Sequence, residues 1–301
     1  METDLAAAYE RCRELHRRHG RTYYLATRLL PGWKRRHVHA LYGFTRYADE
    51  IVDRTEDLSP DERAAALTAW SEAFLAGLAG KPTTDPLLPA VLHTIAVFDL
   101  DRADFASFLR SMAMDLTVMS YATYDDLLDY MEGSAAVIGT MMTPILGSTD
   151  PAAAREPARQ LGIAFQLTNF IRDVAEDLDR GRTYLPDSHL KEFGVTRDDL
   201  FAAHAAGRAT APIKALIKAE VARADEHYAL AAPGIPLLLP ASQACMRTAY
   251  QLYAGILDEV VAADYDVFAR RATVPNRVRA RVAARALLTR PGTPMPAPVR
   301  G

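Results

Sequence analysis

The sequence contains few of the residues that build disulfides or thiolate metal sites. Only two cysteines, Cys12 and Cys245, occur in 301 residues, far apart and outside any metal-ligand spacing. We therefore expect the reduced thiols of a cytoplasmic protein. An excess of basic charge is also missing, because 35 Lys and Arg stand against 38 Asp and Glu, for a net charge of −3. No nucleic-acid partner is predicted from that balance.

Long apolar runs are absent as well. The longest uncharged runs, residues 133–149 and 229–246, are interrupted by Gly and Pro, so no transmembrane span is predicted. Residues 1–20 carry too many charges for a signal peptide, and we expect a soluble protein. The basic exception is a C-terminal group of arginines: Arg270, Arg271, Arg277, Arg279, Arg281, Arg285 and Arg290. A solvated helix face is the simpler interpretation, and peripheral contact with anionic membrane lipid is the alternative.

The sequence also lacks runs in which apolar and polar residues alternate, the pattern typical of β-strands. Its apolar residues recur with helical periodicity instead. Half of the residues are hydrophobic, with no internal repeat or long linker. The expected helices span about 3–19, 34–57, 60–80, 86–98, 102–119, 124–131, 151–178, 211–230, 240–266 and 274–288, with shorter segments at 22–30 and after Thr196. The small-residue run 133–147 suits close packing at a cavity wall. We predict one all-α domain over residues 1–290 and a disordered Pro/Gly-rich tail over 291–301.

The stretch LGIAFQLTNFIRDVAEDLDRGRTYLP, residues 161–186, carries a polar line along an apolar helix. Gln166, Asn169, Asp173 and Asp177 lie three or four residues apart and share one face. The rest of the helix is apolar nearly all round, which is typical of a buried helix. The polar line should therefore face a cavity. Arg172 and Arg182 lie close by in the sequence, and such a set is costly to bury without a ligand.

A second stretch, LYGFTRYADEIVD, repeats the pattern in residues 41–53. It sets Tyr42, Arg46, Asp49 and Asp53 at helical spacing among apolar residues. Either pair of aspartates alone would more often belong to a solvated helix face. Two pairs on two apolar helices, each with an arginine about one turn away or adjacent, favour a functional site.

Four carboxylates that converge on one cavity repel one another unless cations intervene. Mg²⁺ fits them best, because it is usually held by one or two carboxylates together with substrate phosphate oxygens; Mn²⁺ is an alternative. The nearby arginines suit bidentate contacts with phosphate. An apolar cavity then calls for a ligand with a phosphate-rich head and a hydrocarbon tail. Aromatic side chains able to stabilise a carbocation or donate a hydrogen bond are Tyr23, Tyr42, Tyr130 and Tyr253.

These motifs resemble those of a known family. QLTNFIRDVAEDLDRGRTYLP is similar to the second aspartate signature of the squalene/phytoene synthases, and YGFTRYADEIVD is similar to the first. HGRTYYLATRLLP and YMEGSAAVIG resemble further family segments, and the resemblance covers roughly residues 10–288 in the right order. It implies an all-α isoprenoid synthase fold with a central apolar cavity. The form of the first motif and of the N-terminal segment is closest to the phytoene synthases of bacteria.

The resemblance also implies roles for individual residues. It assigns two or three Mg²⁺ ions to Asp49, Asp53, Asn169, Asp173 and Asp177. It assigns catalysis to the four aspartates with Tyr42 and Arg46. It assigns isoprenyl diphosphate binding to His19, Thr22, Tyr42, Arg46, Tyr130, Gln166, Asn169, Arg172, Arg182 and Tyr253. The chain departs from the family in one place, because Gly20 and Thr22 stand where the family's flap segment often carries serine.

The implied reaction is the head-to-head condensation of two geranylgeranyl diphosphates, through prephytoene diphosphate, to phytoene. The alternative is the C30 reaction, from farnesyl diphosphate to squalene or dehydrosqualene. Squalene requires a hydride donor, whereas no NADPH is expected for phytoene. A non-catalytic family member, acting as a scaffold, should have lost metal-ligand aspartates, and all four are present. The sequence carries no indication of oligomeric state.

Overall fold

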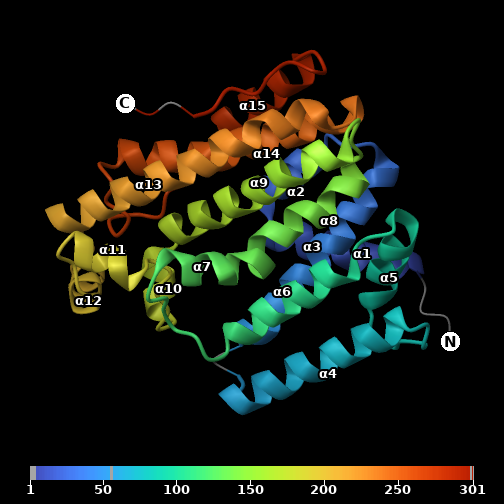
Figure 1. Ribbon diagram of the computed structural model, residues 1–301, viewed down its shortest axis with the longest axis horizontal. Coiled ribbons are helices and arrows are strands. Elements are labelled where there is room, and N and C mark those ends of the chain that lie inside the picture. Colours follow the sequence, from blue (N-terminus) through green and yellow to red (C-terminus); the bar gives the residue numbers. More distant parts are fainter. Residues whose placement is uncertain (1–4, 55–56, 299, 301) are drawn as a thin grey trace.

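Helices account for the whole architecture of the computed structural model, which describes residues 5–54, 57–298 and 300 (Figure 1). Over these residues no strand forms, and β-pairing is confined to isolated bridges such as Ser120 with Thr183. The all-α prediction is confirmed. The elements are α1 (Leu5–His19), α2 (Arg21–Thr27), α3 (Gly32–Asp53), α4 (Pro60–Leu78), α5 (Leu88–Phe98), α6 (Arg102–Met114), α7 (Tyr124–Met131), the π-helical turn η1 (Glu132–Ala136), α8 (Val137–Leu146), α9 (Pro151–Arg172), α10 (Val174–Asp179), α11 (Asp187–Glu192), α12 (Arg197–Ala206), α13 (Ala211–Ala231), the 3-10 turn η2 (Ala232–Leu237), α14 (Pro240–Ala262) and α15 (Asn276–Leu288).

Helix α9 lies at the centre of one half of the fold. It packs against α8, α13, α14 and both short turns, and Figure 1 shows it between α8 and the α13–α14 layer. Over residues 161–171 its apolar side chains point in several directions and are buried, including Ile163, Leu167 and Ile171. A helix that is apolar nearly all round is therefore buried nearly all round, as the sequence predicts.

Helix α3 holds the other half together. It packs against α1, α4, α5, α6 and α8. Phe44 has no exposed surface, and its ring lies 4.8–5.5 Å from the rings of Trp70, Phe74, Phe105 and Phe108. Burying such an aromatic cluster contributes several kcal/mol (about 1.5–3 kcal/mol per side chain). One face of α3 is thereby fixed in the core, which sets the direction of the face that carries Arg46 and Asp49.

The helices around the centre approach closely because glycines replace larger residues. A Cβ atom at Gly139 would lie 2.0 Å from the carbonyl oxygen of Ala158. A Cβ at Gly162 would lie 2.2 Å from the carbonyl oxygen of Ala135. Backbone atoms occupy these positions, so no side chain of any size fits there. The predicted close packing of the small-residue run is confirmed, and it forms one wall of a cavity described below.

The observed helix boundaries differ from the predicted ones at two informative places. The predicted helix 151–178 is interrupted at Asp173, whose φ and ψ are −104° and 14°. Aspartate is a poor residue for a helix interior, since its side chain competes with the backbone. The predicted helix 102–119 ends at Met114, because Thr183 N–H bonds to the Met119 carbonyl (2.9 Å) and holds the following segment to a distant loop.

The C-terminal tail differs from the disorder predicted for it. In the described part of the tail, Met295 is buried. The Gly292 N–H donates to Gln243 Oε1 on α14 at 2.8 Å, and Arg247 donates to the Thr293 carbonyl. Polar side chains of α14 thus form hydrogen bonds with backbone groups of the tail. Because the tail has no hydrophobic periodicity, its sequence does not indicate this packing.

Candidate active site

A polar cavity of about 700 Å³ opens between α3, α9, α14 and the α1–α2 junction. Its size is within the usual range for a small-molecule site. Most of the residues predicted for the site line it: His19, Thr22, Tyr42, Arg46, Asp49, Tyr130, Gln166, Asn169, Arg172 and Tyr253. Of the remaining predicted residues, Asp173 is ion-paired with the lining residues Arg172 and Arg271. Asp53, Asp177 and Arg182 lie outside the lining, where Asp53 pairs with Arg182 and Arg180, and Asp177 pairs with Arg180. The structure thus brings together residues that lie more than 200 positions apart in the sequence.

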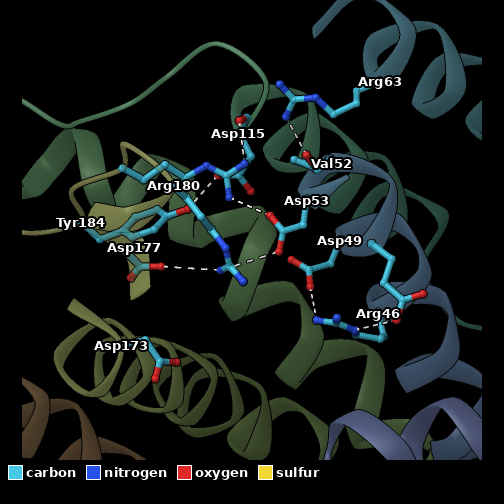
Figure 2. Close-up of polar contacts among 12 residues, drawn as sticks. Arg46, Asp49, Val52, Asp53, Arg63, Asp115, Asp173, Asp177, Arg180 and Tyr184 are labelled. Atoms are coloured by element: carbon cyan, nitrogen blue, oxygen red, sulfur yellow. Dashed lines mark hydrogen bonds and ion pairs between the residues drawn. The ribbon is translucent and has the colours of Figure 1, made fainter. Parts of the chain in front are cut away.

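The first aspartate pair lies on one face of α3, where both carboxylates have arginine partners (Figure 2). Arg46 Nη1 lies 2.6 Å from Asp49 Oδ2. Arg182 Nη1 lies 2.9 Å from Asp53 Oδ1. The Arg182 side chain is only 8% exposed, so this pair is shielded from water and is strongly coupled.

The second pair lies on either side of the interruption between α9 and α10. Asp173 accepts hydrogen bonds from Arg172 Nε at 2.7 Å and from Arg271 Nη2 at 2.7 Å. The backbone bond from Asp177 N–H to the Asp173 carbonyl (2.9 Å) keeps the two acids one turn apart despite the irregular dihedral angles. The predicted shared face therefore persists through the break.

Arg180 links the two pairs. Its Nη1 lies 3.8 Å from Asp53 and 4.0 Å from Asp177, and Figure 2 shows its guanidinium between these two carboxylates. The two motifs therefore face one another across a space that a cationic group already occupies. The sequence analysis did not identify Arg180, and its position directly after the second motif was the only available signal.

Mutual repulsion and burial shift the acid–base equilibria of these carboxylates. Burial, followed by the charge of Asp173, raises the pKa of Asp177 to about 8. Burial and the neighbouring Asp53 raise the pKa of Asp49, and Arg46 opposes this shift. Both shifts mean that a further positive charge in this region would be favourable, because it would replace bound protons.

A tight turn at Gly181 places Arg182 beside Asp53 of the first motif. Gly181 has φ of +73°, a conformation that favours glycine. The Arg182 N–H then bonds to the Asp177 carbonyl at 2.9 Å, while Arg182 Nη2 donates to the Asp115 carbonyl at 3.1 Å. The chain after the second motif thus folds back toward α3.

Asp115 is a further site residue that the sequence analysis missed. Its buried carboxylate accepts hydrogen bonds from Tyr130 Oη at 2.8 Å and from Tyr184 Oη at 3.0 Å. Burial raises its pKa to about 6, and Arg182 opposes the shift. Asp115 sits in a segment predicted as ordinary helix, so only the tertiary contacts reveal that it orients Tyr130.

An apolar cavity continues inward from the polar one. Tyr42, Gln166, Asn169 and Tyr253 line both. The inner cavity is lined by small and apolar residues that include Gly139, Met142, Leu146, Ala158, Gly162, Ile235, Leu238 and Met246. The predicted combination of a charged mouth and an apolar interior is therefore present.

Aromatic rings gather at the junction of the two cavities. Phe165 and Tyr253 are stacked with ring centroids 4.3 Å apart. Tyr23 meets both edge-on, at 5.7 Å from Phe165 and 5.6 Å from Tyr253. Tyr130, predicted as a member of the same aromatic group, lies in the polar cavity instead and is not part of the inner lining. The junction offers ring faces to a cation.

The arrangement is suited to binding and ionising a phosphate ester with a hydrocarbon tail. The donor set of the two motifs is made of carboxylate oxygens, which magnesium prefers. Within the residues the structure describes, no three His, Cys, Asp or Glu side chains come close enough to hold an ion by themselves.

Comparison with known proteins gives a consistent picture at the sequence level. The family model of squalene/phytoene synthases matches residues 16–278. The chain is 35% identical over 283 residues to the 15-cis-phytoene synthase of Synechococcus elongatus, covering 90% of each chain. It is 35% identical over 277 residues to the chloroplastic phytoene synthase 2 of Solanum lycopersicum, covering 90% of this chain and 86% of the relative.

Solved structures with similar folds extend the comparison to three dimensions. A dehydrosqualene synthase crystallised with a ligand is 27% identical, with a TM-score of 0.85 and coverage of 95% of this chain and 97% of the other. A squalene synthase from Alicyclobacillus acidocaldarius is 29% identical, with a TM-score of 0.76 and coverage of 88% and 97%. Both similarities span nearly the whole helical fold described above.

Proposed function

The chain belongs to the squalene/phytoene synthase family, and on that premise we propose that it joins two molecules of geranylgeranyl diphosphate head to head. In the first half-reaction one allylic diphosphate ionises and its cation alkylates the double bond of the second molecule; loss of a proton then closes a cyclopropane ring, giving prephytoene diphosphate and free diphosphate. In the second, prephytoene diphosphate loses its diphosphate, rearranges and loses a proton, which yields phytoene. The enzyme is therefore a prenyltransferase of isoprenoid and carotenoid biosynthesis.

One observation carries the reaction class: a mouth of carboxylates and arginines is continuous with an apolar cavity through shared residues such as Tyr42 and Asn169. A diphosphate head and a prenyl tail require that combination. The choice of a C20 substrate is supported by the relatives, which are named phytoene synthases and cover most of this chain.

We propose that Mg²⁺ binds between the two motifs, held by Asp49, Asp53, Asp173 and Asp177, with Asn169 beside them. The all-oxygen donor set and the raised pKa values of Asp49 and Asp177 support this assignment. Substrate phosphate oxygens would complete the coordination, as is usual for this ion. When bound, Mg²⁺ supplies positive charge that stabilises a departing diphosphate.

The chain's own residues have three tasks in this reaction. Arg46, Arg172 and Arg271 lie along the polar cavity, where they can bind phosphate oxygens and stabilise the leaving diphosphate. The apolar lining of the inner cavity excludes water, which would otherwise trap a carbocation as an alcohol. The rings of Tyr23, Phe165 and Tyr253 present aromatic faces that stabilise positive charge without forming a bond to it.

The C30 reaction is the second candidate, supported by the dehydrosqualene and squalene synthases among the similar folds. The same site would perform it, with a shorter tail in the apolar cavity. A scaffold role is less well supported, because all four aspartates are present and Arg180 lies between Asp53 of the first motif and Asp177 of the second.

A product assay with the purified protein tests the proposal. Geranylgeranyl and farnesyl diphosphate are supplied separately with Mg²⁺, each with and without NADPH, and extracted lipids are identified by mass. The expected result is a C40 hydrocarbon from geranylgeranyl diphosphate that does not depend on NADPH. A C30 hydrocarbon alone would move the assignment to the second candidate. No hydrocarbon from either substrate, with the protein folded, would contradict the enzymatic function.

We further propose that the protein contacts membranes peripherally, since its product is apolar. Among the described helices, none combines the length and apolarity needed to cross a bilayer. Helix α15 carries exposed Arg277, Arg281 and Arg285, and at its end Leu287 and Leu288 are 61% and 85% exposed. Arg271 and Arg279, which we grouped with this basic cluster, line the polar cavity instead.

The position of this end of α15 supports the membrane proposal. Gly292 bonds to Gln243 near the start of α14, and Leu239 N–H bonds to the Gly147 carbonyl at 2.9 Å. The exposed leucines therefore lie at the end of the molecule where Leu146 and Leu238 line the apolar cavity.

Liposome flotation tests this membrane contact. Anionic vesicles should retain the parent protein, and the Leu287→Ser, Leu288→Ser double variant should bind at least several-fold less. The Leu230→Ser variant, which changes an equally exposed leucine on α13, should bind like the parent. Equal binding of both variants would contradict this surface.

A further inference from the structure

Tyr42 occupies the junction of the two cavities, and its ring packs against residues that the aspartate motifs do not include. On one side the imidazole of His16 is stacked on it, with centroids 4.0 Å apart and an interplanar angle of 11°. Gly20 also lies against this ring, since a Cβ atom there would be only 2.7 Å from ring atoms of Tyr42. The placement of the ring thus leaves no room for a Cβ atom at position 20, one of the two positions where the chain departs from the family pattern.

His16 is itself held by a second buried histidine. His16 has no exposed surface, and His39 is 2% exposed. Their Nδ1 atoms lie 2.9 Å apart. Burial lowers the pKa of His16 to about 2 and that of His39 to about 4. Both rings are therefore neutral, and one Nδ1–H donates to the other Nδ1.

This arrangement is costly for the fold. Among the described residues, neither His16 Nε2 nor His39 Nε2 has a hydrogen-bond partner, although both atoms are buried. Since only one ring carries its proton on Nδ1, the other must carry it on Nε2, so one buried N–H donor is unpaired. An unpaired buried donor costs about 1–3 kcal/mol. An apolar residue of similar size would avoid that cost, so stability alone does not account for the histidine pair.

We propose that His16 is a positioning residue that fixes the ring of Tyr42 at the boundary between the charged mouth and the apolar cavity. His16 lines neither cavity, so it acts through the rings that it contacts, of which Tyr42 is the one stacked on it. Stacking on His16 and contact with Gly20 restrict tilting of the Tyr42 ring. The restricted ring thereby limits the access of water from the mouth to the inner cavity. This role rests on the proposed prenyl transfer for its effect on turnover, but the restriction of the ring does not.

The inference predicts a defined phenotype for His16→Ala. Removing the imidazole leaves a gap behind Tyr42, and a mobile ring admits water to the inner cavity. We expect kcat to fall about 10-fold or more, consistent with the cost of small misplacements in an active site. KM should change less than 3-fold, and prenyl alcohols should appear among the products. His16→Phe, which restores a stacked ring, should recover most of kcat.

Two further variants distinguish positioning from general stability. His37→Ala removes another buried histidine of α3 that bonds to Tyr9 Oη (2.9 Å), away from both cavities. It should lower the melting temperature as His16→Ala does, while kcat and the product distribution stay unchanged. Gly20→Ala places a Cβ atom against the ring of Tyr42 and displaces it, so it should reproduce the His16→Ala phenotype even if His16→Ala folds poorly. Equal kcat losses in His37→Ala and His16→Ala would contradict the inference.

A spectroscopic readout makes the test independent of turnover. The protein is labelled with 3-fluorotyrosine, and the Tyr42 signal in the ¹⁹F NMR spectrum is identified by its absence in Tyr42→Phe. We expect that signal to shift and sharpen in Gly20→Ala or His16→Ala, and to stay unchanged in His37→Ala. An unchanged Tyr42 signal in both site variants would overturn the inference. A parent that makes no hydrocarbon would instead contradict only the proposed function.

Discussion

The two aspartate motifs share the same spacing but lie in different surroundings. Asp49 and Asp53 belong to an uninterrupted helix, α3, and Asp49 is 41% exposed toward the polar cavity. Asp173 and Asp177 flank a break between α9 and α10, and their side chains are only 16% and 12% exposed. Equal spacing in the sequence therefore gives a first motif with one carboxylate open to the mouth, although Asp53 is only 17% exposed, and a second motif with both carboxylates shielded.

The shielded motif needs neighbouring cations to neutralise its buried charge. Arg172 and Arg271 bond to Asp173, and Arg180 spans the space to Asp53. The open motif depends on the other one for Arg182. We infer that the motifs act as one site.

Removing one ligand charge from either motif should have the largest effect. Asp49→Asn and Asp173→Asn should each lower kcat on the order of 10³-fold, since each removes a carboxylate needed to hold the metal charge that stabilises the departing diphosphate. Helix content, measured by circular dichroism, should not change. Asp101→Asn is a matched control, because asparagine also caps the start of α6. Full activity of either site variant at limiting Mg²⁺ would rule out the metal assignment.

Breaking the contact between the motifs should have the next largest effect. Arg182→Gln leaves the buried carboxylate of Asp53 without its closest cation, which should lower the free energy of unfolding by about 2–4 kcal/mol and reduce turnover. Urea denaturation measures the change. Arg197→Gln removes a pair with Asp187 whose side chains are 40% and 46% exposed, and it should cost less than about 1 kcal/mol. Similar losses in the two variants would show that Arg182 does not link the motifs.

The shielded motif should make stability depend on pH. The pKa of Asp177 is raised from 3.8 to about 8 in the folded protein, so the folded state binds more protons than the unfolded state between these values. The stability that the protonated Asp177 contributes is therefore fully present below about pH 4 and is lost as pH rises toward 8. Asp177→Asn cannot ionise, so without metal it should be more stable than the parent at pH 8, by roughly 1–4 kcal/mol, and similar to it near pH 4.

Thermal unfolding in EDTA at several pH values measures this difference. Magnesium with inorganic diphosphate should reverse the trend in the parent and have little effect on the variant. If the unfolding temperatures of parent and variant change in parallel across this pH range, the environment of Asp177 does not raise its pKa.

The turn that returns the chain to α3 should show the smallest effect. Gly181→Ala places an L-residue at φ of +73°, which should cost about 1 kcal/mol. Gly80→Ala is a matched control at φ of +82°, and no atoms obstruct a Cβ at either position. Both variants should lose similar stability, but only Gly181→Ala should also lower kcat, because it moves Arg182. Equal kcat values in the two variants would show that the turn at Gly181 does not position Arg182 for the reaction.

Local sequence patterns were sufficient to predict much of the fold. The capping boxes at Ser59, Thr123 and Thr196 start helices where the sequence predicts them. The polar line on α9 faces a cavity because the remaining faces are apolar, a property of the helix itself. The residues of the polar mouth could be named because two motifs and a family resemblance pointed to them.

Features that depend on distant contacts could not be predicted. Asp115 lies in an ordinary helical pattern, and its role follows from Tyr130, Tyr184 and Arg182, which come from other parts of the chain. The stacking of His16 on Tyr42 requires the packing of α1 against α3, which no local period indicates. The break at Asp173 and the packed tail have the same cause, since tertiary partners override local preference.

Calorimetric titration of Mg²⁺ and inorganic diphosphate into the protein tests most directly whether the two motifs form one site. The parent should bind diphosphate only when Mg²⁺ is present. Asp49→Asn, in the open motif, and Asp173→Asn, in the shielded one, should each lose most of that binding, although each keeps the other motif intact. If either variant binds magnesium diphosphate as tightly as the parent, the motifs act separately and the account is contradicted.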